Sequence, residues 1–512
     1  MKEYVITHLH TMNSNSILAD SPSKLEDYLK EIKNKDGIRG IIRTEHGHCQ
    51  NWFKTYQLME KYNYKYIHAV EGYTCLNGDD KYNFHILLYG LNFLGFQEIN
   101  RLVSDSSVRD GHYYKRPRMF IDDILKCENI AISTSCSGGV FANLKEDSKE
   151  SGDVVKDKLL KWGIKNKDKF FVEIQPHIHN KQIIVNNTVI KLHKEFGFNI
   201  ICSNDVHYVN KDFQEIRKII SIDKNSGEES EFELAFDLSI KSYVEQYRSF
   251  INLGIEKDIV IEALNNTNKL YDMCEEYKID CEFKYPQIYE NPKETILNRA
   301  ISNLYKLDYL NNEDIPKYIE RIQYEIDVME HLEALSYINL FSDWLTWCRE
   351  QGIAIGFGRG SGSSSIINYL TNITGIDSIV WDTTFDRFLN KNKRVTVDID
   401  TDIEPARRQE ARDWFFNHPK LNCADILTFN TVAYKGACDT IIRTSELTKQ
   451  QGSQLKEMYA DIRTEFELED SDLFREKLPI SIDELEKRMG DYGDLIKKVV
   501  LLEGCIMSVG SH

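Results

Sequence analysis

The sequence predicts an α/β protein of several domains, and three observations lead to this prediction. Up to about residue 210, short runs rich in β-branched residues alternate with amphipathic segments, which is typical of an α/β domain with mostly parallel strands, either barrel or open sheet. From about residue 212 to 345 the pattern becomes helical. A Gly/Ser-rich turn and an acidic strand follow, and helical patterns then dominate from residue 424 onward.

Composition limits the possible functions. With 512 residues the chain is long enough for roughly two to four domains. Its net charge of −17 excludes a protein that coats nucleic acid through general basicity, so nucleic-acid contact has to be local, through clusters of Lys and Arg. The acidic excess also fits a protein that holds several divalent metal ions. Eleven cysteines without a C-x-x-C pair, and the lack of a signal-like or membrane-spanning apolar run, predict a cytoplasmic location and no membrane partner.

The front domain is expected to contain strands separated by helices. The expected strands are EYVITHLH, IRGIIRTEHG, YKYIHAVEGY, FHILLYGLN, NIAISTSCSGG, FFVEIQ and FNIICSNDVHY, in this order. After the first strand, Ser21 and Pro22 precede an apolar stripe of Leu25, Tyr28 and Leu29, which predicts the start of a helix.

Nearly every one of these strands ends in a potential metal ligand. The candidates are His8, His10, Asp20, His46, Glu71, His85, Cys136, Asp205 and His207. Because the carboxyl ends of barrel strands share one face, we expect these side chains to converge. Imidazoles, carboxylates and one thiolate together favour Zn, Mn or Fe, and more than four ligands predict a cluster of metal ions. A single H-x-H pair is more often just a polar strand face, and we expect His177 and His179 not to be primary ligands.

A second acidic group lies in RVTVDIDTDIEPARR, where Asp398, Asp400 and Asp402 alternate with apolar residues. In an extended strand these carboxylates share one face, which is costly without a cation. Upstream, GFGRGSGSSS is a turn whose backbone N–H groups, with Arg359, favour a phosphate. Arg387 and Arg394 flank the acidic strand, so the set indicates nucleotide triphosphate chemistry with two metal ions. The alternatives are a solvated edge strand or a structural calcium site.

The order of these motifs resembles two known domains. The series H-x-H, Asp, T-E-H, V-E-G, His, Cys and N-D-V-H, over residues 1 to 210, resembles the PHP (polymerase and histidinol phosphatase) domain. All nine ligand positions of that family are filled, while Glu45 stands where the family usually has Asp and need not be a ligand. GRGS, FDRFLN, VDIDTD and TFNTVAYKGACDTI follow in the order seen in C-family replicative DNA polymerases of the DNA polymerase III alpha type. Val397 departs from the Pro of that family.

The resemblance implies a PHP-type distorted (β/α) barrel, a nucleotidyltransferase-like palm with a mixed sheet and a helical thumb. The implied ranges are 1–215 for the PHP core, 216–284 for a helical connection completing it, 285–428 for the palm, 429–500 for the thumb and 501–512 for the start of a return to the palm. Asp398 and Asp400 would be catalytic and hold Mg²⁺. Arg359, Gly360, Ser361 and Arg387 would contact the triphosphate, and Lys435 a nucleic-acid phosphate. The PHP site would hold two to three Zn²⁺ or Mn²⁺ ions as a 3′–5′ exonuclease.

The family also has parts that are not found in this sequence. A third catalytic Asp, the fingers, a clamp-binding segment and a nucleic-acid-binding OB module are expected from a second polypeptide, an intein partner or the rest of a shortened chain. We therefore expect this chain alone to polymerise DNA poorly. Its partners would be primer-template DNA, dNTPs, that second polypeptide and, through it, a sliding clamp, in a bacterial or phage-infected cell. The rival hypotheses are a stand-alone PHP phosphoesterase for small phosphomonoesters and a non-catalytic scaffold stabilised by metal.

Overall fold

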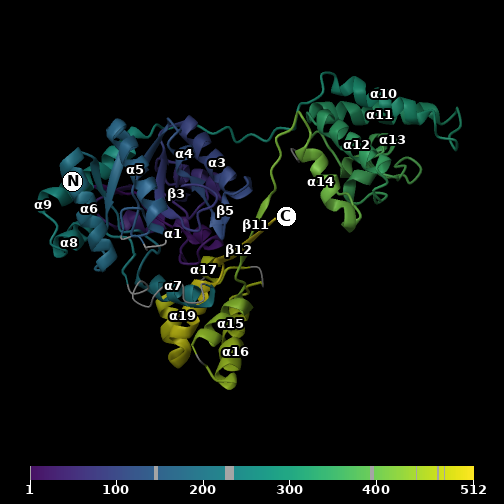
Figure 1. Cartoon of the computed structure of the whole chain (residues 1–512). Helices are drawn as coiled ribbons and strands as arrows, with labels where there is room; N and C mark the ends of the chain where they lie inside the picture. The colour runs from purple at the N-terminus through teal and green to yellow at the C-terminus, as the bar shows by residue number, and fades with distance from the viewer. Residues whose placement is uncertain are drawn as a thin grey trace. The chain divides into compact units, whose positions relative to one another are not determined.

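The chain folds into two compact units in the computed structural model. It describes residues 2–142, 144, 148–224, 236–392, 397–445, 447–469, 472–477 and 479–511. One unit combines Met1–Lys278 with Leu427–His512, and the other is Ile279–Ile426 (Figure 1). Among the described residues, no helix is both long and apolar enough to cross a membrane.

The first unit is built around a distorted barrel, as the fold class predicted. Its strands are β1 (Tyr4–Ile6), β2 (Ile38–Ile41), β3 (Ala69–Cys75), β4 (Phe84–Gly90), β8 (Ile130–Ser133), β9 (Phe170–Ile174) and β10 (Asn199–Cys202). One sheet has the order β10-β9-β8-β4-β3-β7, with the short β7 (Met119–Phe120) at its edge, and β1 pairs with β2 separately. Two isolated bridges, Leu9 with Val206 and His46 with Glu71, connect these sheets around the barrel. Both bridges involve or adjoin predicted ligands, so the barrel closes at the predicted metal site.

The direction of β4 differs from the mostly parallel sheet expected. β4 runs antiparallel to both β3 and β8, whereas β1–β2, β8–β9 and β9–β10 are parallel. Residues 76–83 connect β3 to β4, and this segment is too short for the dozen or more residues that a parallel crossover needs. His85 therefore lies near the start of its strand, at the same end of the barrel as the carboxyl ends of β3 and β8.

Helices surround the barrel in the first unit. They are η1 (Met12–Ser16), α1 (Leu25–Glu31), η2 (Ile32–Asn34), α2 (Trp52–Lys61), α3 (Phe93–Val108), α4 (Ile121–Ile124), α5 (Lys149–Lys165), η4 (Lys167–Lys169), α6 (Asn180–Phe196), α7 (Lys211–Lys224), α8 (Tyr243–Asn252) and α9 (Lys257–Met273). A small hairpin of β5 (Tyr113–Tyr114) and β6 (Arg116–Pro117) follows α3. The buried apolar faces of these elements form a continuous core with the barrel strands.

The C-terminal segment of the chain packs on this same unit. Its elements are β11 (Leu427–Thr431), α15 (Tyr434–Thr444), α16 (Lys449–Glu465), α17 (Phe474–Lys477), α18 (Ile482–Arg488), η9 (Gly490–Tyr492), α19 (Gly493–Leu502) and β12 (Ile506–Ser511), with β12 antiparallel to β11. Asn15 of η1 donates a hydrogen bond to the carbonyl of Ile506 (3.0 Å), and Lys497 lies 3.2 Å from Asp212 of α7. The range expected for the thumb thus shares a core with the PHP range.

The second unit is largely helical. It contains α10 (Pro292–Leu304), α11 (Ile315–His331), α12 (Leu335–Glu350), η6 (Gly360–Ser364), α13 (Ile366–Leu370), η7 (Phe385–Arg387), η8 (Pro405–Arg407) and α14 (Arg408–Phe416). The mixed sheet expected for the palm is reduced, in the described part of this unit, to one antiparallel bridge between Ile355 and Ile403. The pairing does not extend beyond this bridge on one side because the N–H of Ala354 donates to the side chain of Glu404 and not to its carbonyl. Two backbone hydrogen bonds remain: the N–H of Gly356 donates to the carbonyl of Asp402, and the N–H of Glu404 donates to the carbonyl of Ala354.

Candidate functional site

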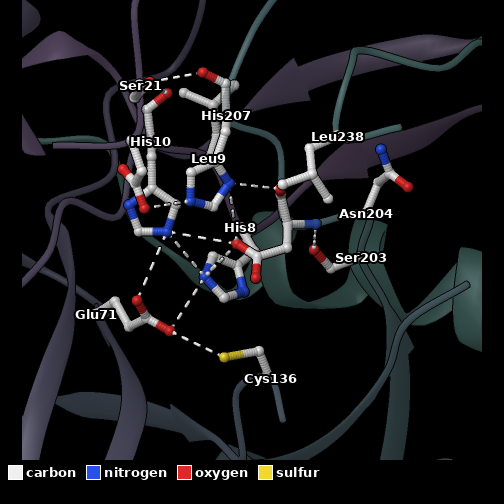
Figure 2. Close-up of polar contacts among 12 residues, drawn as sticks. His8, Leu9, His10, Ser21, Glu71, Cys136, Ser203, Asn204, His207 and Leu238 are labelled. Carbon is white, nitrogen blue, oxygen red and sulfur yellow. Dashed lines mark hydrogen bonds and ion pairs between the residues drawn. The ribbon is translucent and has the colours of Figure 1, made fainter. Parts of the chain in front are cut away.

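The nine predicted ligands of the front domain lie together at one end of the barrel. They come from separate elements: the segments that follow β1, β2, β8 and β10, the interior of β3, the start of β4, and the loop before α1. β3 continues to Cys75, so Glu71 does not stand at the strand end where the sequence placed it. Figure 2 shows His8, His10 and His207 turned toward one another, with Glu71 and Cys136 beside them. A pocket of about 270 Å³ opens onto this cluster.

Glu71 lies at the centre of the cluster. Its Oε1 lies 3.0 Å from Nδ1 of His85 and 3.3 Å from Nε2 of His8. Its Oε2 lies 2.8 Å from Nδ1 of His46 and 3.6 Å from Nε2 of His10. Sγ of Cys136 is 3.7 Å from the same carboxylate. One carboxylate thus faces four imidazoles and a thiol, which is the arrangement expected of a bridging ligand.

Two further carboxylates face the same histidines. Oδ2 of Asp20 lies 3.1 Å from Nε2 of both His46 and His207. Oδ1 of Asp205 lies 3.1 Å from Nε2 of His8 and 3.5 Å from Nε2 of His10. Asp205 has a φ of 51°, in the left-handed region that non-Gly residues seldom adopt. Strained backbone of this kind is concentrated at functional sites.

The electrostatics of the cluster fit a divalent cation. Burial, with the neighbouring His46 and His207, lowers the pKa of His10 to about 3, so this imidazole is neutral and able to ligate. Burial alone would lower the pKa of His8, but Asp205, Glu173 and Glu71 outweigh it and raise that pKa. Within the described residues, Oδ1 of Asp20 is buried without a hydrogen-bond partner. Buried carboxylate oxygens without donors are costly, and a metal ion satisfies them.

Three overlapping groups of side chains have ligand atoms close enough to share an ion. These groups are His10, His46 and His207; His8, His10 and Glu71; and Glu71, His85 and Cys136. His10 and Glu71 each belong to two groups, so the residues fit a cluster of ions better than a single one. Burial and the nearby Glu71 carboxylate raise the pKa of the Cys136 thiol well above its ordinary value, and a bound cation would oppose that shift.

Two buried glutamates orient the histidines, and the sequence reasoning did not assign them this role. Oε1 of Glu173, on β9, lies 3.0 Å from Nδ1 of His8. Glu45 accepts hydrogen bonds from the Thr11 N–H (3.0 Å) and the Ser14 hydroxyl (2.5 Å), and Oγ of Ser14 lies 3.0 Å from Nδ1 of His10. A glutamate inside the otherwise apolar run FFVEIQ was the signal available for Glu173.

Replacement of Ser14 by Ala tests the contact behind His10. Because the variant loses the hydroxyl 3.0 Å from Nδ1 of His10 but no ligand, we expect metal affinity to fall about 10- to 100-fold. The matched control is Ser16→Ala in the same η1 segment, whose hydroxyl contacts His48 instead. Competition with a fluorescent chelator measures both affinities, and equal affinities for the two variants would refute this role.

The acidic row of the second unit has the orientation predicted for it. Asp398, Asp400 and Asp402 are exposed, while the intervening Val397 and Ile399 are buried, so the carboxylates share one face. Burial, and after it the Asp398 carboxylate, raises the pKa of Tyr337 to about 12.

The Gly/Ser turn lies against this row. A Cβ at Gly360 would lie 2.9 Å from Oδ2 of Asp400, and the φ of Gly360 is +66°, so glycine is the residue that fits. Nη1 of Arg359 lies 3.5 Å from Oδ1 of Asp402, with both side chains mostly exposed. Ser361 follows in η6, and Arg387 is exposed at the end of η7.

Two further basic residues were predicted to take part. Arg394 lies outside the described residues. Lys435 belongs to the other compact unit, on α15, with its Nζ 5.2 Å from the ring centre of Tyr434.

A buried carboxylate behind the Gly/Ser turn holds it in place. Glu325 of α11 is fully buried and accepts hydrogen bonds from the Ser365 hydroxyl (2.7 Å) and the N–H groups of Ile366 and Ile367 (both 3.1 Å). It also pairs with Nε of Arg321 at 2.7 Å, and Nη2 of Arg321 donates to the carbonyl of Ser364. The pair therefore connects α11 to the end of the turn and to the first residues of α13.

Replacement of Glu325 by Ala should destabilise the second unit. The change leaves two buried N–H groups and Nε of Arg321 without their acceptor, so we expect the free energy of unfolding to fall by about 3 kcal/mol. The control is Glu330→Ala on the same helix, which removes only an exposed pair with Lys293 and should cost less than about 0.5 kcal/mol. Urea unfolding followed by tryptophan fluorescence compares them, and equal losses would contradict this account.

Comparison with known proteins identifies two domains. The PHP domain model matches residues 7–177, and the model of the bacterial DNA polymerase III alpha NTPase domain matches residues 294–512. The DNA polymerase III subunit alpha of Borreliella burgdorferi is 28% identical over 479 residues, covering 89% of this chain and 40% of that protein. Those of Helicobacter pylori strain J99 and Aquifex aeolicus are 27% and 25% identical, covering 90% and 89% of this chain. The chain thus spans about 40% of the length of these curated relatives.

Proposed function

We propose, from the premise that this chain belongs to the DNA polymerase III alpha family, that it forms part of a DNA-directed DNA polymerase with two separate metal-dependent sites. One site, in the PHP domain, would trim the 3′ end of a DNA strand. The other, in the second unit, would join a dNTP to a primer. Both reactions attack a phosphorus atom, and both need cations beside the phosphate.

The PHP site is proposed to hold two to three Zn²⁺ or Mn²⁺ ions. The observation that carries this proposal is the convergence of the nine predicted ligands, three of them buried carboxylates, in three overlapping groups whose ligand atoms could share ions. Bound ions would supply a hydroxide at neutral pH and neutralise the charge of a phosphate. Glu71, Asp20 and Asp205 would bind the ions together with the histidines, while Glu173 and Ser14 orient the rings of His8 and His10.

The second site is proposed to hold Mg²⁺ at Asp398 and Asp400. Their exposed face beside the Gly/Ser turn supports this proposal, since carboxylate oxygens are the ligands that Mg²⁺ takes. Backbone N–H groups of Gly360 and Ser361, with Arg359 and Arg387, would hold the triphosphate, and Lys435 a DNA phosphate. A second polypeptide would supply the third carboxylate and the fingers. Bound Mg²⁺ would lower the pKa of the primer 3′-hydroxyl.

A comparison of three reactions tests this proposal. We expect the metal-loaded chain to shorten a 5′-labelled primer from its 3′ end, with activity lost on chelation, and to hydrolyse p-nitrophenyl phosphate far more slowly. Primer extension is expected only when a polypeptide with the remaining polymerase segments is added. Preference for the small ester would favour a stand-alone phosphoesterase, and a metal-loaded chain inert toward both would favour a scaffold.

A further inference from the structure

Another pocket, of about 260 Å³, lies in the second unit beside the Gly/Ser turn. The side chains that line it include Phe357 of this turn, Asn303 of α10, Arg349 of α12 and Tyr369 of α13. The pocket adjoins the acidic row, because Gly356 in its wall donates its N–H to the carbonyl of Asp402 (3.0 Å). These four side chains are neither proposed metal ligands nor proposed triphosphate contacts, so the sites described above give the pocket no role.

Phe357 presents an aromatic ring at the edge of this pocket. Its side chain is 81% exposed, although the backbone below it is fixed, since the N–H of Gly375 donates to the Phe357 carbonyl. The ring rests on Gly375: a Cβ at that position would lie 2.6 Å from Cδ1 of Phe357, closer than the ring allows. A single exposed apolar residue is ordinary on a protein surface. A ring that is supported by a glycine and lines a pocket is, in addition, suited to stacking on a planar ligand.

A second ring of the lining is held in place by hydrogen bonds. The hydroxyl of Tyr369 lies 3.1 Å from the hydroxyl of Tyr309. Tyr309 donates in turn to the buried carboxylate of Asp377 (2.6 Å), so this row of polar groups fixes the outer end of the Tyr369 side chain. The pocket therefore offers two rings whose positions are set before any ligand arrives, which lowers the entropy cost of binding.

Two cations at this pocket contact neutral oxygens instead of carboxylates. Nη1 of Arg349 donates to the carbonyls of Leu345 (3.4 Å) and Asn372. Nζ of Lys306 donates to Oδ1 of Asn303 (3.1 Å), which belongs to the lining. Both cationic side chains are exposed, and in the part of the chain that the structure describes no carboxylate lies within ion-pair distance of either. Their charge therefore favours an anionic ligand.

We propose that this pocket binds one nucleotide of a single-stranded DNA, whose base stacks on the ring of Phe357 while its phosphate pairs with Arg349 and Lys306. The inference rests on the proposed function, which brings a DNA strand to the second unit, and it adds a site apart from the metal and triphosphate contacts. Aromatic rings beside cations are the means by which proteins hold single strands without selecting a sequence. The pocket is smaller than the roughly 300–1,000 Å³ typical of sites for drug-sized ligands, which fits one base better than a longer segment.

Binding of a short fluorescein-labelled oligo(dT) strand, followed by fluorescence anisotropy, tests the pocket without any reaction. Phosphorothioate linkages at the 3′ end protect the strand from trimming. The informative variant is Phe357→Ala, for which we expect the Kd to rise about tenfold, because it removes the stacking ring. Phe357→Tyr keeps a ring and should bind like the wild type. The control is Phe283→Ala, which removes a ring that is 65% exposed in the same unit but outside the pocket.

Arg349→Gln tests the charge of the pocket in the same assay. Each phosphate that a cation neutralises steepens the dependence of log Kd on log salt concentration, by about 0.7 for a single strand. We therefore expect weaker binding at low salt and a slope that is smaller by about 0.7. Arg412→Gln is the control, because that guanidinium already pairs with Asp425 (3.0 Å), and its slope should equal that of the wild type.

The outcomes separate this proposal from the proposed function. Wild-type affinity in Phe357→Ala, equal losses in Phe357→Ala and Phe357→Tyr, or a wild-type chain that does not bind the strand would each overturn the proposal. Free dTTP that binds as tightly as the strand, with the same dependence on Phe357, would overturn the assignment to a strand. Binding that depends on Phe357, in a chain that neither trims nor extends a primer, would refute the proposed function and leave this pocket standing. If Phe357→Ala does not fold, Arg349→Gln decides, and an unchanged slope counts against the pocket.

Discussion

Replacement of Glu71 by Gln is expected to remove the metal ions from the PHP pocket and to slow 3′-end trimming roughly a thousandfold, which corresponds to about 4 kcal/mol. Glu71 faces His8, His10, His46, His85 and Cys136, with both oxygens in use. The amide of Gln has the same size but offers one neutral oxygen, so it cannot bridge two cations. Primer trimming and bound metal are measured on the same preparation.

A matched variant separates this effect from a general loss of charge. Glu60→Gln changes an exposed carboxylate on α2, and we expect metal content and trimming like those of the wild type. Trimming by a metal-free Glu71→Gln chain at the wild-type rate would show that the activity does not arise in this pocket. Retained metal with lost activity would move Glu71 from metal binding to a direct role in the reaction.

Replacement of Asp400 by Asn is expected to reduce primer extension by the reconstituted polymerase roughly a thousandfold, again about 4 kcal/mol. Asp400 stands on the exposed face of the acidic row and lies against Gly360 in the Gly/Ser turn. In the proposed function it would connect a metal ion to the triphosphate. Single-turnover extension, with the complementary polypeptide present, measures the change, and trimming by the PHP site should not change.

Asp402 provides the control within the same row. Its Oδ1 lies 3.5 Å from the guanidinium of Arg359 and both groups are largely exposed, so Asp402→Asn removes a weak pair and should cost tenfold or less. Equal losses for Asp400→Asn and Asp402→Asn would mean that the row acts through its overall charge. A full rate in Asp400→Asn would exclude the proposed catalytic role.

The ligand cluster could be predicted because most of its members can be recognised from the short stretch of sequence around each of them. Most candidates follow or begin a strand, and barrel topology brings such positions to one face, so they meet in the structure. Asp20, in the loop before α1, and Glu71, inside β3, join them from other positions. Models of the PHP domain and of the bacterial DNA polymerase III alpha NTPase domain match the chain, in the order that the motifs suggested. The roles of Glu45, Glu173 and Ser14 depend instead on side-chain orientation across the barrel, which no spacing in the sequence specifies.

Other features depend on long-range pairing. The antiparallel direction of β4 is an exception, because it follows from a local feature. The connection over residues 76–83 is too short for a parallel crossover, so this direction could have been predicted from the sequence. The packing of the C-terminal helices on the PHP unit rests on contacts such as Asn15 with Ile506, which are 491 positions apart. Within the described residues, the predicted palm strands pair at a single bridge, between Ile355 and Ile403. The pairing stops there on one side because the N–H of Ala354 donates to the Glu404 side chain and not to the Glu404 carbonyl.

Metal analysis of the purified chain is the most direct test of the central claim, that carboxylates and imidazoles from distant segments gather to hold divalent ions. After equilibration with Zn²⁺ or Mn²⁺ and removal of free metal, plasma mass spectrometry should find about two to three tightly bound ions per wild-type chain and far fewer in Glu71→Gln. A folded wild-type chain that holds less than one ion, or the same number as Glu71→Gln, would contradict the account.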